Sequence, residues 1–306
     1  IIGSGPAGIT ISIILAQRGY RVTLFESRDY IGGVLRYGIP EFRLPKAALE
    51  KYREKLVELG VKIRPNTVIG HGGLVIDDLF RDGYKAIFIG TGVWKPNALG
   101  IEGESLGHVH FAINYLKNPA VYDLGERVAI IGAGNAAMDV ARTAIRKGTR
   151  QVTVFFLMGE EQLTANRAEV AYAKVEGVQF EYFKQPVKIT DDGVIFADTR
   201  LIDGGDGGAE FERIPNTERL YEADNVIVSI SQGPRNYIVS TTDGIEADGR
   251  GLLVTDAHGR TTREGIFASG DVVSGARTVV EAVSYSKSVA DAMEEYIRNA
   301  AENPPI

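Results

Sequence analysis

Cysteine is absent from this 306-residue sequence, which also contains only one tryptophan and three methionines. Without a thiol, these residues have no means of forming a disulphide, a CxxC redox pair, a thiolate zinc site or a cysteine-ligated iron–sulfur cluster. Histidine is scarce too, and we predict no metal site because none of the four histidines belongs to a metal-ligand motif. His108 and His110 would point to the same face of a strand, but we favour a surface turn for this pair. The four histidines are His71, His108, His110 and His258.

Long apolar runs are also lacking: no segment approaches the roughly 18–20 apolar residues that a membrane-spanning helix requires. The charge balance is mildly acidic, with 40 Asp and Glu against 34 Lys and Arg, which disfavours nucleic acid as a partner. We therefore expect a cytoplasmic location, no membrane span and no nucleic-acid site. Glycine, in contrast, is abundant at 36 residues, as is typical of proteins with many tight turns and close backbone approaches.

One pattern occurs twice, at residues 1–26 and 130–156. In each copy a short apolar run is followed by a glycine-rich turn, a helical stretch, a glycine and a second strand, which is the βαβ arrangement. The two copies predict an α/β protein with two Rossmann-like, dinucleotide-binding domains. Alternating apolar and polar residues over 170–224 predict an antiparallel β meander in addition.

Two further segments, 87–96 and 226–234, each combine a buried strand with a following Gly and Pro. We interpret them as paired crossings between the domains, so that the second domain is inserted into the first. The predicted first domain is 1–96 plus 235–306, and the predicted second domain is 97–234. Because the sequence opens inside a strand at Ile1, we expect it to be part of a longer protein.

The first glycine-rich turn is a complete GxGxxG motif. Gly3, Gly5 and Gly8 follow a strand and open a helix, and Glu26 ends the next strand. Glycine lets the backbone approach a pyrophosphate, the helix N-terminus supplies free N–H groups, and the acid accepts hydrogen bonds from ribose hydroxyls. The motif in this setting predicts a dinucleotide site.

Two other segments narrow the cofactor to FAD. The stretch 32–45 is too rich in glycine and proline for a helix and lies where a flavin would extend. Near the end of the sequence, Gly270 and Asp271 follow a buried strand, and a helix starts close to Thr278 and Val279, where its N-terminus would face the flavin. Two roles are open for Asp271: it contacts FAD, or it caps the N-terminus of the following helix.

These motifs resemble a known family: flavoprotein reductase subunits related to the small (β) subunit of glutamate synthase. The same module occurs in the NADPH-binding subunit of electron-bifurcating transhydrogenase and in dihydropyrimidine dehydrogenase. The resemblance runs nearly end to end and is most specific in GGVLRYGIPEFRLPK at 32–46 and GIFASGDVVSGARTVVEA at 265–282. It implies FAD contacts at Gly3, Gly5, Pro6, Ala7, Glu26, Gly33, Leu35, Arg43, Ile69, Gly270 and Asp271. It also implies an N-terminal iron–sulfur domain, which would lie upstream of this sequence.

The second glycine-rich turn predicts a site for NAD(P)H. It reads GxGxxA and again lies between a strand and a helix. Its candidate binding residues are Gly132, Gly134, Asn135, Ala136 and Ala137, with Gly233 of the SQGP crossing added from the resemblance.

The end of the following strand decides between NADH and NADPH, because an NADP site places a cation there for the 2′-phosphate. Relatives that use NADPH carry basic residues at the positions of Leu157 and Met158, and some carry a third near Thr164; all three are neutral here. We therefore favour NADH. Glu160 or Glu161 would then bind the ribose, and Arg167 is the one candidate that would restore NADPH binding.

Hydride transfer between nicotinamide and flavin requires only that the two rings meet at a near-attack distance, so we assign no catalytic acid, base or nucleophile. Two roles are open for Trp94 and Lys95: they contact the nicotinamide, or they only pack against other side chains of the protein. Since no thiol is present to accept electrons, we predict an NAD(P)H oxidoreductase subunit that passes them to an external iron–sulfur or flavin centre in a partner. Two alternatives are a structural or regulatory flavoprotein subunit with a degenerate nicotinamide site, and a stand-alone NADH oxidase or diaphorase.

Overall fold

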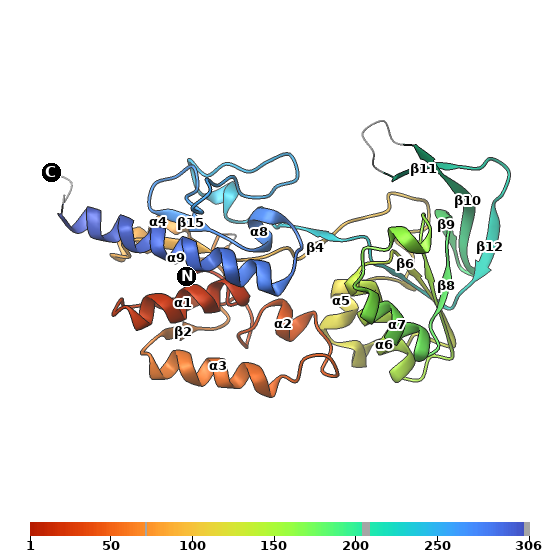
Figure 1. Ribbon diagram of the computed structural model, residues 1–306, viewed down its shortest axis with the longest axis horizontal. Coiled ribbons are helices and arrows are strands. Elements are labelled where there is room, and N and C mark those ends of the chain that lie inside the picture. Colours follow the sequence, from red (N-terminus) through yellow and green to blue (C-terminus); the bar gives the residue numbers. More distant parts are fainter. Residues whose placement is uncertain (71, 204–208, 303–306) are drawn as a thin grey trace. The chain divides into compact units, whose positions relative to one another are not determined.

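The computed structural model describes residues 1–70, 72–203 and 209–302. The chain forms two compact units, the first made of residues 1–37, 41–95 and 232–306 and the second of residues 38–40 and 96–231. Each unit has its own parallel strands and its own buried core (Figure 1). The mixed α/β architecture with parallel sheets, which the sequence predicts, is confirmed.

Short parallel strands form the centre of the first unit: β1 (Thr23–Phe25), β2 (Lys62–Arg64), β3 (Ile87–Ile89) and β15 (Ile266–Ala268). β1 pairs with β2, and β3 pairs with β15. Ile2 joins the two pairs, because it bridges to Phe25 on one side and to Ile89 on the other. Since every pairing is parallel, all five segments end at the same edge, where loops gather to bind ligands in such sheets.

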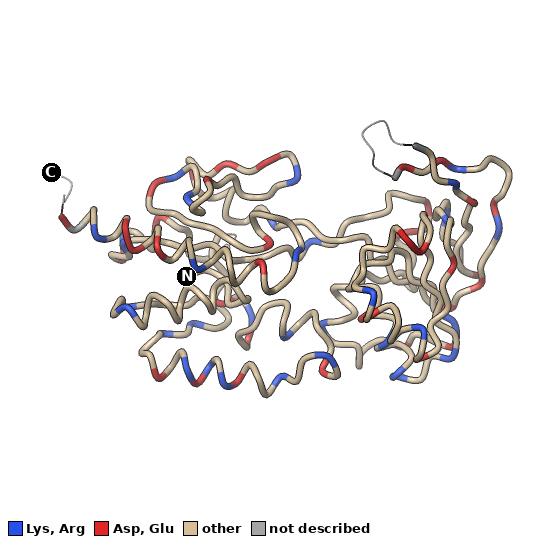
Figure 2. Tube along the Cα trace, in the orientation of Figure 1, with Lys and Arg blue, Asp and Glu red and all other residues tan. Residues whose placement is uncertain are grey.

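Helices cover this layer: α1 (Pro6–Gln17), α2 (Val34–Tyr37), α3 (Ala47–Glu58), α4 (Ile76–Arg81), α8 (Asp271–Ser274) and α9 (Val279–Glu302). α1 is apolar along most of its length, and its Ile11 and Leu15 share a buried cluster with Val289 and Met293 of α9. α3 and α9 carry interspersed charges of both signs, as expected of helices with one solvent-facing side (Figure 2). α2 corrects a prediction, since one helical turn forms inside the segment expected to contain none.

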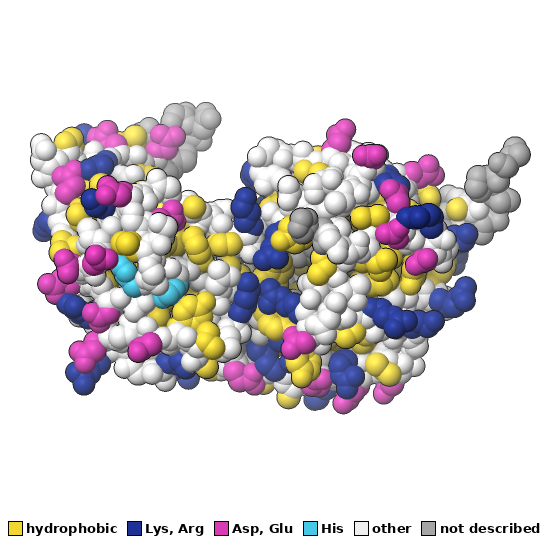
Figure 3. Space-filling model, turned by 180° about the vertical axis from the view of Figure 1, so that it is seen from behind, with side chains coloured by type: hydrophobic (Ala, Val, Ile, Leu, Met, Phe, Trp, Pro, Cys, Tyr) yellow, Lys and Arg dark blue, Asp and Glu magenta, His cyan; other side chains and the backbone are white. Residues whose placement is uncertain are grey.

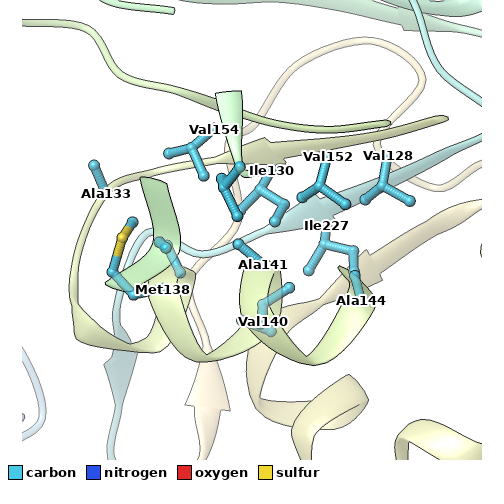
Figure 4. Close-up of a cluster of buried hydrophobic side chains, with 14 of the residues drawn as sticks. Val128, Ile130, Ala133, Met138, Val140, Ala141, Ala144, Val152, Val154 and Ile227 are labelled. Atoms are coloured by element: carbon cyan, nitrogen blue, oxygen red, sulfur yellow. The ribbon is translucent and has the colours of Figure 1, made fainter. Parts of the chain in front are cut away.

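A five-stranded parallel sheet forms the second unit, in the order β5 (Val109–Phe111), β13 (Asn225–Val228), β6 (Arg127–Ile131), β7 (Gln151–Phe155) and β8 (Gln179–Glu181). The helices of this unit are α5 (Ala112–Lys117), α6 (Asn135–Arg146) and α7 (Arg167–Val175). Figure 4 shows how α6 lies on the sheet, with Met138 and Ala141 directed toward Ile130 and Val154. These side chains are fully buried, so the glycine turn before α6 is held by a packed core.

An antiparallel sheet completes the second unit: β9 (Lys184–Thr190), β10 (Gly193–Asp203), β11 (Ala209–Arg213) and β12 (Arg219–Glu222). The other three strands all pair with β10. The antiparallel meander predicted over 170–224 is wrong at its start, because residues 167–175 form the helix α7. Asn166 caps this helix through a hydrogen bond from the Ala168 N–H, and the buried Val170 and Ala173 are spaced for a helical face.

Two further short strands, β4 (Lys95–Pro96) and β14 (Gln232–Gly233), pair with each other and lie within the segments predicted to be crossings, 87–96 and 226–234. Single 3₁₀ turns are found at Pro119–Val121, Glu160–Gln162 and Val239–Thr241. In the described part of the chain, no helix is both long enough and apolar enough to cross a bilayer.

Candidate functional site

The three glycines of the first motif have three different surroundings. Gly3 has a φ of +95°, and a Cβ built on it would lie 2.5 Å from the Gly90 carbonyl oxygen. A Cβ on Gly8 would lie 1.9 Å from the Gly3 carbonyl oxygen, so the turn and the helix touch there without room for a side chain. A Cβ on Gly5 would meet nothing within 4 Å. Only Gly5 therefore faces open space, as required of the position where a pyrophosphate approaches the backbone.

The start of α1 supplies the charge that such a ligand needs. Gly5 is the N-cap and Pro6 the first helical residue, and no side chain caps this end of the helix. The first N–H groups of a helix have no partner within it and carry a partial positive charge. Ala7, which is buried, and Gly8 contribute two of these groups, so the residues present suit the phosphates of a dinucleotide.

A second glycine loop lies against this turn. Gly33 has a φ of +52°, and a Cβ on it would lie 2.8 Å from the Cα of Gly5. The Gly32 N–H donates to the Ser4 carbonyl oxygen at 2.9 Å, which fixes the contact. Leu35 follows in α2, where its carbonyl oxygen accepts from the Lys46 ammonium at 2.7 Å. The structure thus brings Gly33 to the motif, and Leu35 lies two residues after Gly33.

Glu26 lies at the end of β1 and is 5% exposed. Its Oε2 accepts from the Ser4 N–H at 3.1 Å and from the Ser4 hydroxyl, and its Oε1 accepts from the Arg28 N–H at 2.9 Å. Its carbonyl oxygen accepts from the Thr67 N–H at 2.8 Å, which draws the loop carrying Ile69 to the same strand end. The carboxylate is therefore held next to the glycine turn. Arg43 is half-buried and lies between α2 and α3 in the sequence.

The C-terminal segment reaches the same helix start. Gly270 has a φ of +77°, and its Cβ would lie 3.2 Å from the Cβ of Ala7. Asp271 is the first residue of α8 and accepts from the Arg277 N–H at 3.3 Å, while burial raises the pKa of its carboxyl to about 6. The cap of α9 is Thr278, whose hydroxyl is 2.6 Å from Oε2 of Glu281 and accepts from the Glu281 N–H in return.

Asp271→Asn is expected to remove a pH dependence of stability. The pKa of an aspartate in an unfolded chain is about 3.9, whereas that of Asp271 in the fold is about 6. As the pH rises between these values the unfolded chain loses its proton first, so the free energy of unfolding falls, by about 2 kcal/mol after solvent screening.

The variant lacks this loss, so its unfolding free energy equals that of the wild type near pH 4 and exceeds it at about pH 7. Urea unfolding of flavin-free protein at a series of pH values measures the difference. Parallel profiles for the two proteins would contradict the burial of this carboxyl.

The second glycine turn repeats the geometry of the first. Gly132 has a φ of +111°, and its Cβ would lie 2.3 Å from the Ser229 carbonyl oxygen. Gly134 caps α6 without a side-chain bond, and its Cβ would meet only the Thr164 hydroxyl at 3.6 Å, an ordinary contact. Asn135 is exposed and accepts from the Asn166 N–H at 2.8 Å, whereas Ala137 is fully buried and Ala136 is half-buried.

The loop after β7 is neutral and firmly held. Leu157 and Met158 are half-buried, and their carbonyl oxygens accept from the Thr199 hydroxyl at 2.6 Å and the Phe183 N–H at 3.1 Å. Lys174 pairs with Glu160 at 2.5 Å and holds the pKa of that carboxyl below its usual range, so Glu160 is engaged. Arg167 is exposed at the start of α7, and no carboxylate among the described residues forms an ion pair with it.

The histidine prediction is wrong in part. His108 directly precedes β5, His110 lies within it, and both are half-buried. Nε2 of His108 is 3.1 Å from the Thr190 carbonyl oxygen, and Nε2 of His110 is 2.9 Å from Oδ1 of Asn225. Histidine side chains of this unit are visible at its surface in Figure 3. His71 lies outside the described residues. Within those residues, no three His, Asp or Glu side chains are grouped to hold a metal ion.

Sequence reasoning missed one arrangement at the first site. The Arg28 guanidinium carbon lies 4.0 Å from the centre of the Trp94 ring and 4.4 Å from the centre of the Tyr37 ring. Trp94 was expected to contact either nicotinamide or its own packing neighbours, and the structure places it against Arg28. No local pattern signals this contact, because the three residues come from separate segments: Arg28 follows β1, Tyr37 ends α2 and Trp94 follows β3.

Comparison with known proteins agrees with this geometry. The profile of the family described as "Pyridine nucleotide-disulphide oxidoreductase" matches residues 1–286. The NADP(+)-dependent formate dehydrogenase subunit beta of Moorella thermoacetica is 35% identical over 322 residues, covering 100% of this chain and 45% of that protein. The glutamate synthase [NADPH] small chain of Halomonas elongata is 35% identical over 319 residues, covering 97% and 67%. The NAD-dependent dihydropyrimidine dehydrogenase subunit PreT of Salmonella typhimurium is 32% identical over 305 residues, covering 98% and 68%.

The chain thus spans under half of the first relative and about two thirds of the other two. Among solved structures, Mycobacterium tuberculosis FprA in complex with NADPH has the same fold, with a TM-score of 0.83 and 16% identity over 98% of this chain and 84% of that one. The predicted resemblance to the glutamate synthase small subunit is confirmed. Because the family match covers nearly all of the sequence, this chain belongs to the pyridine nucleotide-disulphide oxidoreductase family and is an FAD-dependent NAD(P)H oxidoreductase.

Proposed function

We propose that the first unit holds FAD, that the second holds NADH, and that the chain passes electrons from NADH through FAD to an iron–sulfur or flavin centre outside it. The observation that carries this proposal is the pair of glycine turns, in which Gly5 and Gly134 face space free of close contacts while Gly3 and Gly132 are packed against carbonyl oxygens. FAD, when bound, accepts a hydride from nicotinamide and releases electrons to other redox groups.

The chain's own part is to bind and orient. In the first unit, the α1 N-terminus and the backbone at Gly5 would bind the pyrophosphate, Glu26 would bind ribose, and the Asp271 segment would face the flavin end. The proposed FAD residues are Gly3, Gly5, Pro6, Ala7, Gly8, Glu26, Gly33, Leu35, Arg43, Ile69, Gly270, Asp271, Thr278 and Val279. The proposed nicotinamide-dinucleotide residues are Gly132, Gly134, Asn135, Ala136, Ala137 and Gly233.

The choice of NADH rests on the neutral loop after β7. A 2′-phosphate held without a cation would lose charge-assisted hydrogen bonds worth roughly 1.5–3 kcal/mol each. Leu157 and Met158 carry no positive charge, and Thr164 next to Gly134 is also neutral. The relatives differ in this respect: those from Moorella and Halomonas are named for NADP(+) and NADPH, and the one from Salmonella is named as NAD-dependent.

An external acceptor follows from the chemistry of the chain. The family is named for disulphide reduction, yet these residues include no cysteine, so electrons have no disulphide to reach within them. The relatives are themselves named as a subunit beta, a small chain and a subunit, which supports a partner that carries the next redox centre.

Anaerobic addition of NADH to the FAD-loaded protein is expected to bleach the visible absorption band of oxidised flavin, and NADPH is expected to do so only at much higher concentration. Gly134→Ala is the matched control, because it should retain FAD and lose the response to NADH. Loaded protein that neither nucleotide reduces would refute the proposed electron path, and reduction at lower NADPH than NADH concentration would refute the choice of nucleotide.

A further inference from the structure

The Arg28 guanidinium contacts two aromatic rings. Its guanidinium carbon lies 4.0 Å from the Trp94 ring centre and 4.4 Å from the Tyr37 ring centre, distances at which cation–π attraction is effective. These ring contacts leave the in-plane N–H donors of the guanidinium available for hydrogen bonding. Within the described part of the chain, no hydrogen bond or ion pair is made by those donors.

The stack lies at the first glycine motif. The Tyr37 N–H donates to the Gly33 carbonyl oxygen at 3.0 Å, and Gly33 is packed on Gly5. Trp94 follows closely after Gly90, whose carbonyl oxygen touches Gly3. Arg28 itself lies two residues after Glu26 and donates its N–H to that carboxylate. All three residues therefore belong to segments next to the glycine turn at which we propose that FAD binds.

A second arginine adds to the positive charge here. The Arg235 guanidinium carbon lies 5.6 Å from the centre of the Tyr237 ring, and a Cβ on Gly70 would lie 2.6 Å from the Tyr237 carbonyl oxygen. The loop that leads to Gly70 is bonded to Arg28, because the Asn66 N–H donates to the Arg28 carbonyl oxygen at 2.9 Å. Burial, and with it the Arg235 charge, lowers the pKa of Arg28, while Glu26 and Asp29 nearby oppose this effect. Two cations without an ion-pair partner among the described residues are costly to keep close together, unless an anion binds between them.

We propose that Arg28 and Arg235 bind a phosphate group of the FAD on the first glycine turn, and that Tyr37 and Trp94 orient the Arg28 guanidinium for this contact. The inference rests on the proposed function. It extends the phosphate site beyond the N-terminus of α1 by a pair of side chains, and it explains why the half-buried Arg28 guanidinium has no acceptor among the residues that the structure describes.

The test measures FAD affinity by fluorescence quenching in flavin-stripped protein, at several salt concentrations, and inorganic pyrophosphate serves as a competitor. Arg28→Ala is expected to weaken FAD binding roughly 10- to 100-fold, as the loss of a charge-assisted contact does. It should also flatten the salt dependence of that affinity and weaken competition by pyrophosphate.

Arg28→Met keeps an apolar stem between the rings and should show the same loss if Arg28→Ala proves too unstable to study. Arg28→Lys, which lacks the planar fork, should recover the affinity only in part. The control is Arg21→Ala, an exposed arginine before the opposite end of β1, which should bind FAD as the wild type does.

Three outcomes would overturn the phosphate contact: unchanged FAD affinity in Arg28→Met, a loss that is equal at all salt concentrations, or a loss confined to the affinity for NADH. Each can be observed only when the wild-type chain itself binds FAD. A wild type that binds no FAD refutes the proposed function instead, so the two failures are distinguishable.

Discussion

Gly5→Ala is expected to give a folded protein that purifies without flavin. The backbone of Gly5 has a φ of −70° and a ψ of −175°, values that alanine adopts freely, and the new methyl group meets no protein atom within 4 Å. The space it fills is the space a pyrophosphate needs to approach the N–H groups of α1. We therefore expect FAD affinity to fall by about 100-fold, with the free energy of unfolding of the flavin-free protein nearly unchanged.

Flavin content after purification, FAD titration and thermal unfolding together measure this result. Gly3→Ala is the contrasting variant: its Cβ would strain a φ of +95° and lie 2.5 Å from a carbonyl oxygen, so it should lose more than about 2 kcal/mol of stability. If Gly5→Ala kept its flavin at wild-type affinity, the first turn would not be the pyrophosphate site.

The double variant Leu157→Arg, Met158→Arg is expected to gain affinity for NADPH by about 100-fold while binding NADH much as before. Both side chains are half-buried in the loop after β7, where a dinucleotide on the Gly132 turn presents its adenosine ribose. An arginine is long enough to keep its stem on the protein and its charged end in solvent, where it meets the 2′-phosphate. Each charge-assisted contact contributes roughly 1.5–3 kcal/mol, which sets the expected gain.

The matched control is Leu157→Gln, Met158→Gln, which removes the apolar groups but adds no charge and should leave NADPH affinity low. Arg167→Ala completes the set, because it removes the cation that the wild type already has at the start of α7. Michaelis constants for both nucleotides with a soluble dye as acceptor provide the measurement. An arginine pair that leaves NADPH affinity unchanged would mean that the 2′-phosphate lies elsewhere, and a large loss of NADPH affinity in Arg167→Ala would assign it to that residue.

The parts of the fold that local sequence determines were predictable. Gly3 and Gly132 each require a positive φ, and the strand–turn–helix around each is specified within about 25 contiguous residues. The helix at 167–175 was missed because Val170 and Tyr172 alternate with small residues as they would in a strand. The capping Asn166 and the spacing of Val170 and Ala173 were the signals that favoured a helix.

Contacts between distant segments were beyond prediction. The contacts of Arg28 require the segments around residues 28, 37 and 94 to converge, and nothing near Arg28 in the sequence specifies either ring. The same holds for His110, whose partner Asn225 comes from the neighbouring strand β13. The cofactor contacts taken from family resemblance remain predictions, and the variants above are chosen to test them one unit at a time.

The pairing of β3 with β15 constrains how the polypeptide acquires its structure during synthesis. Ile87 is made long before its partner Ile266, and the whole of 96–231 emerges from the ribosome between them. The second unit is nearly contiguous in sequence, so its synthesis is finished before that of the first unit. Until β15 is synthesised, the edge of β3 in the first unit has no partner strand. Contacts of such large sequence separation form slowly, so truncation before β15 would leave an exposed edge prone to aggregation.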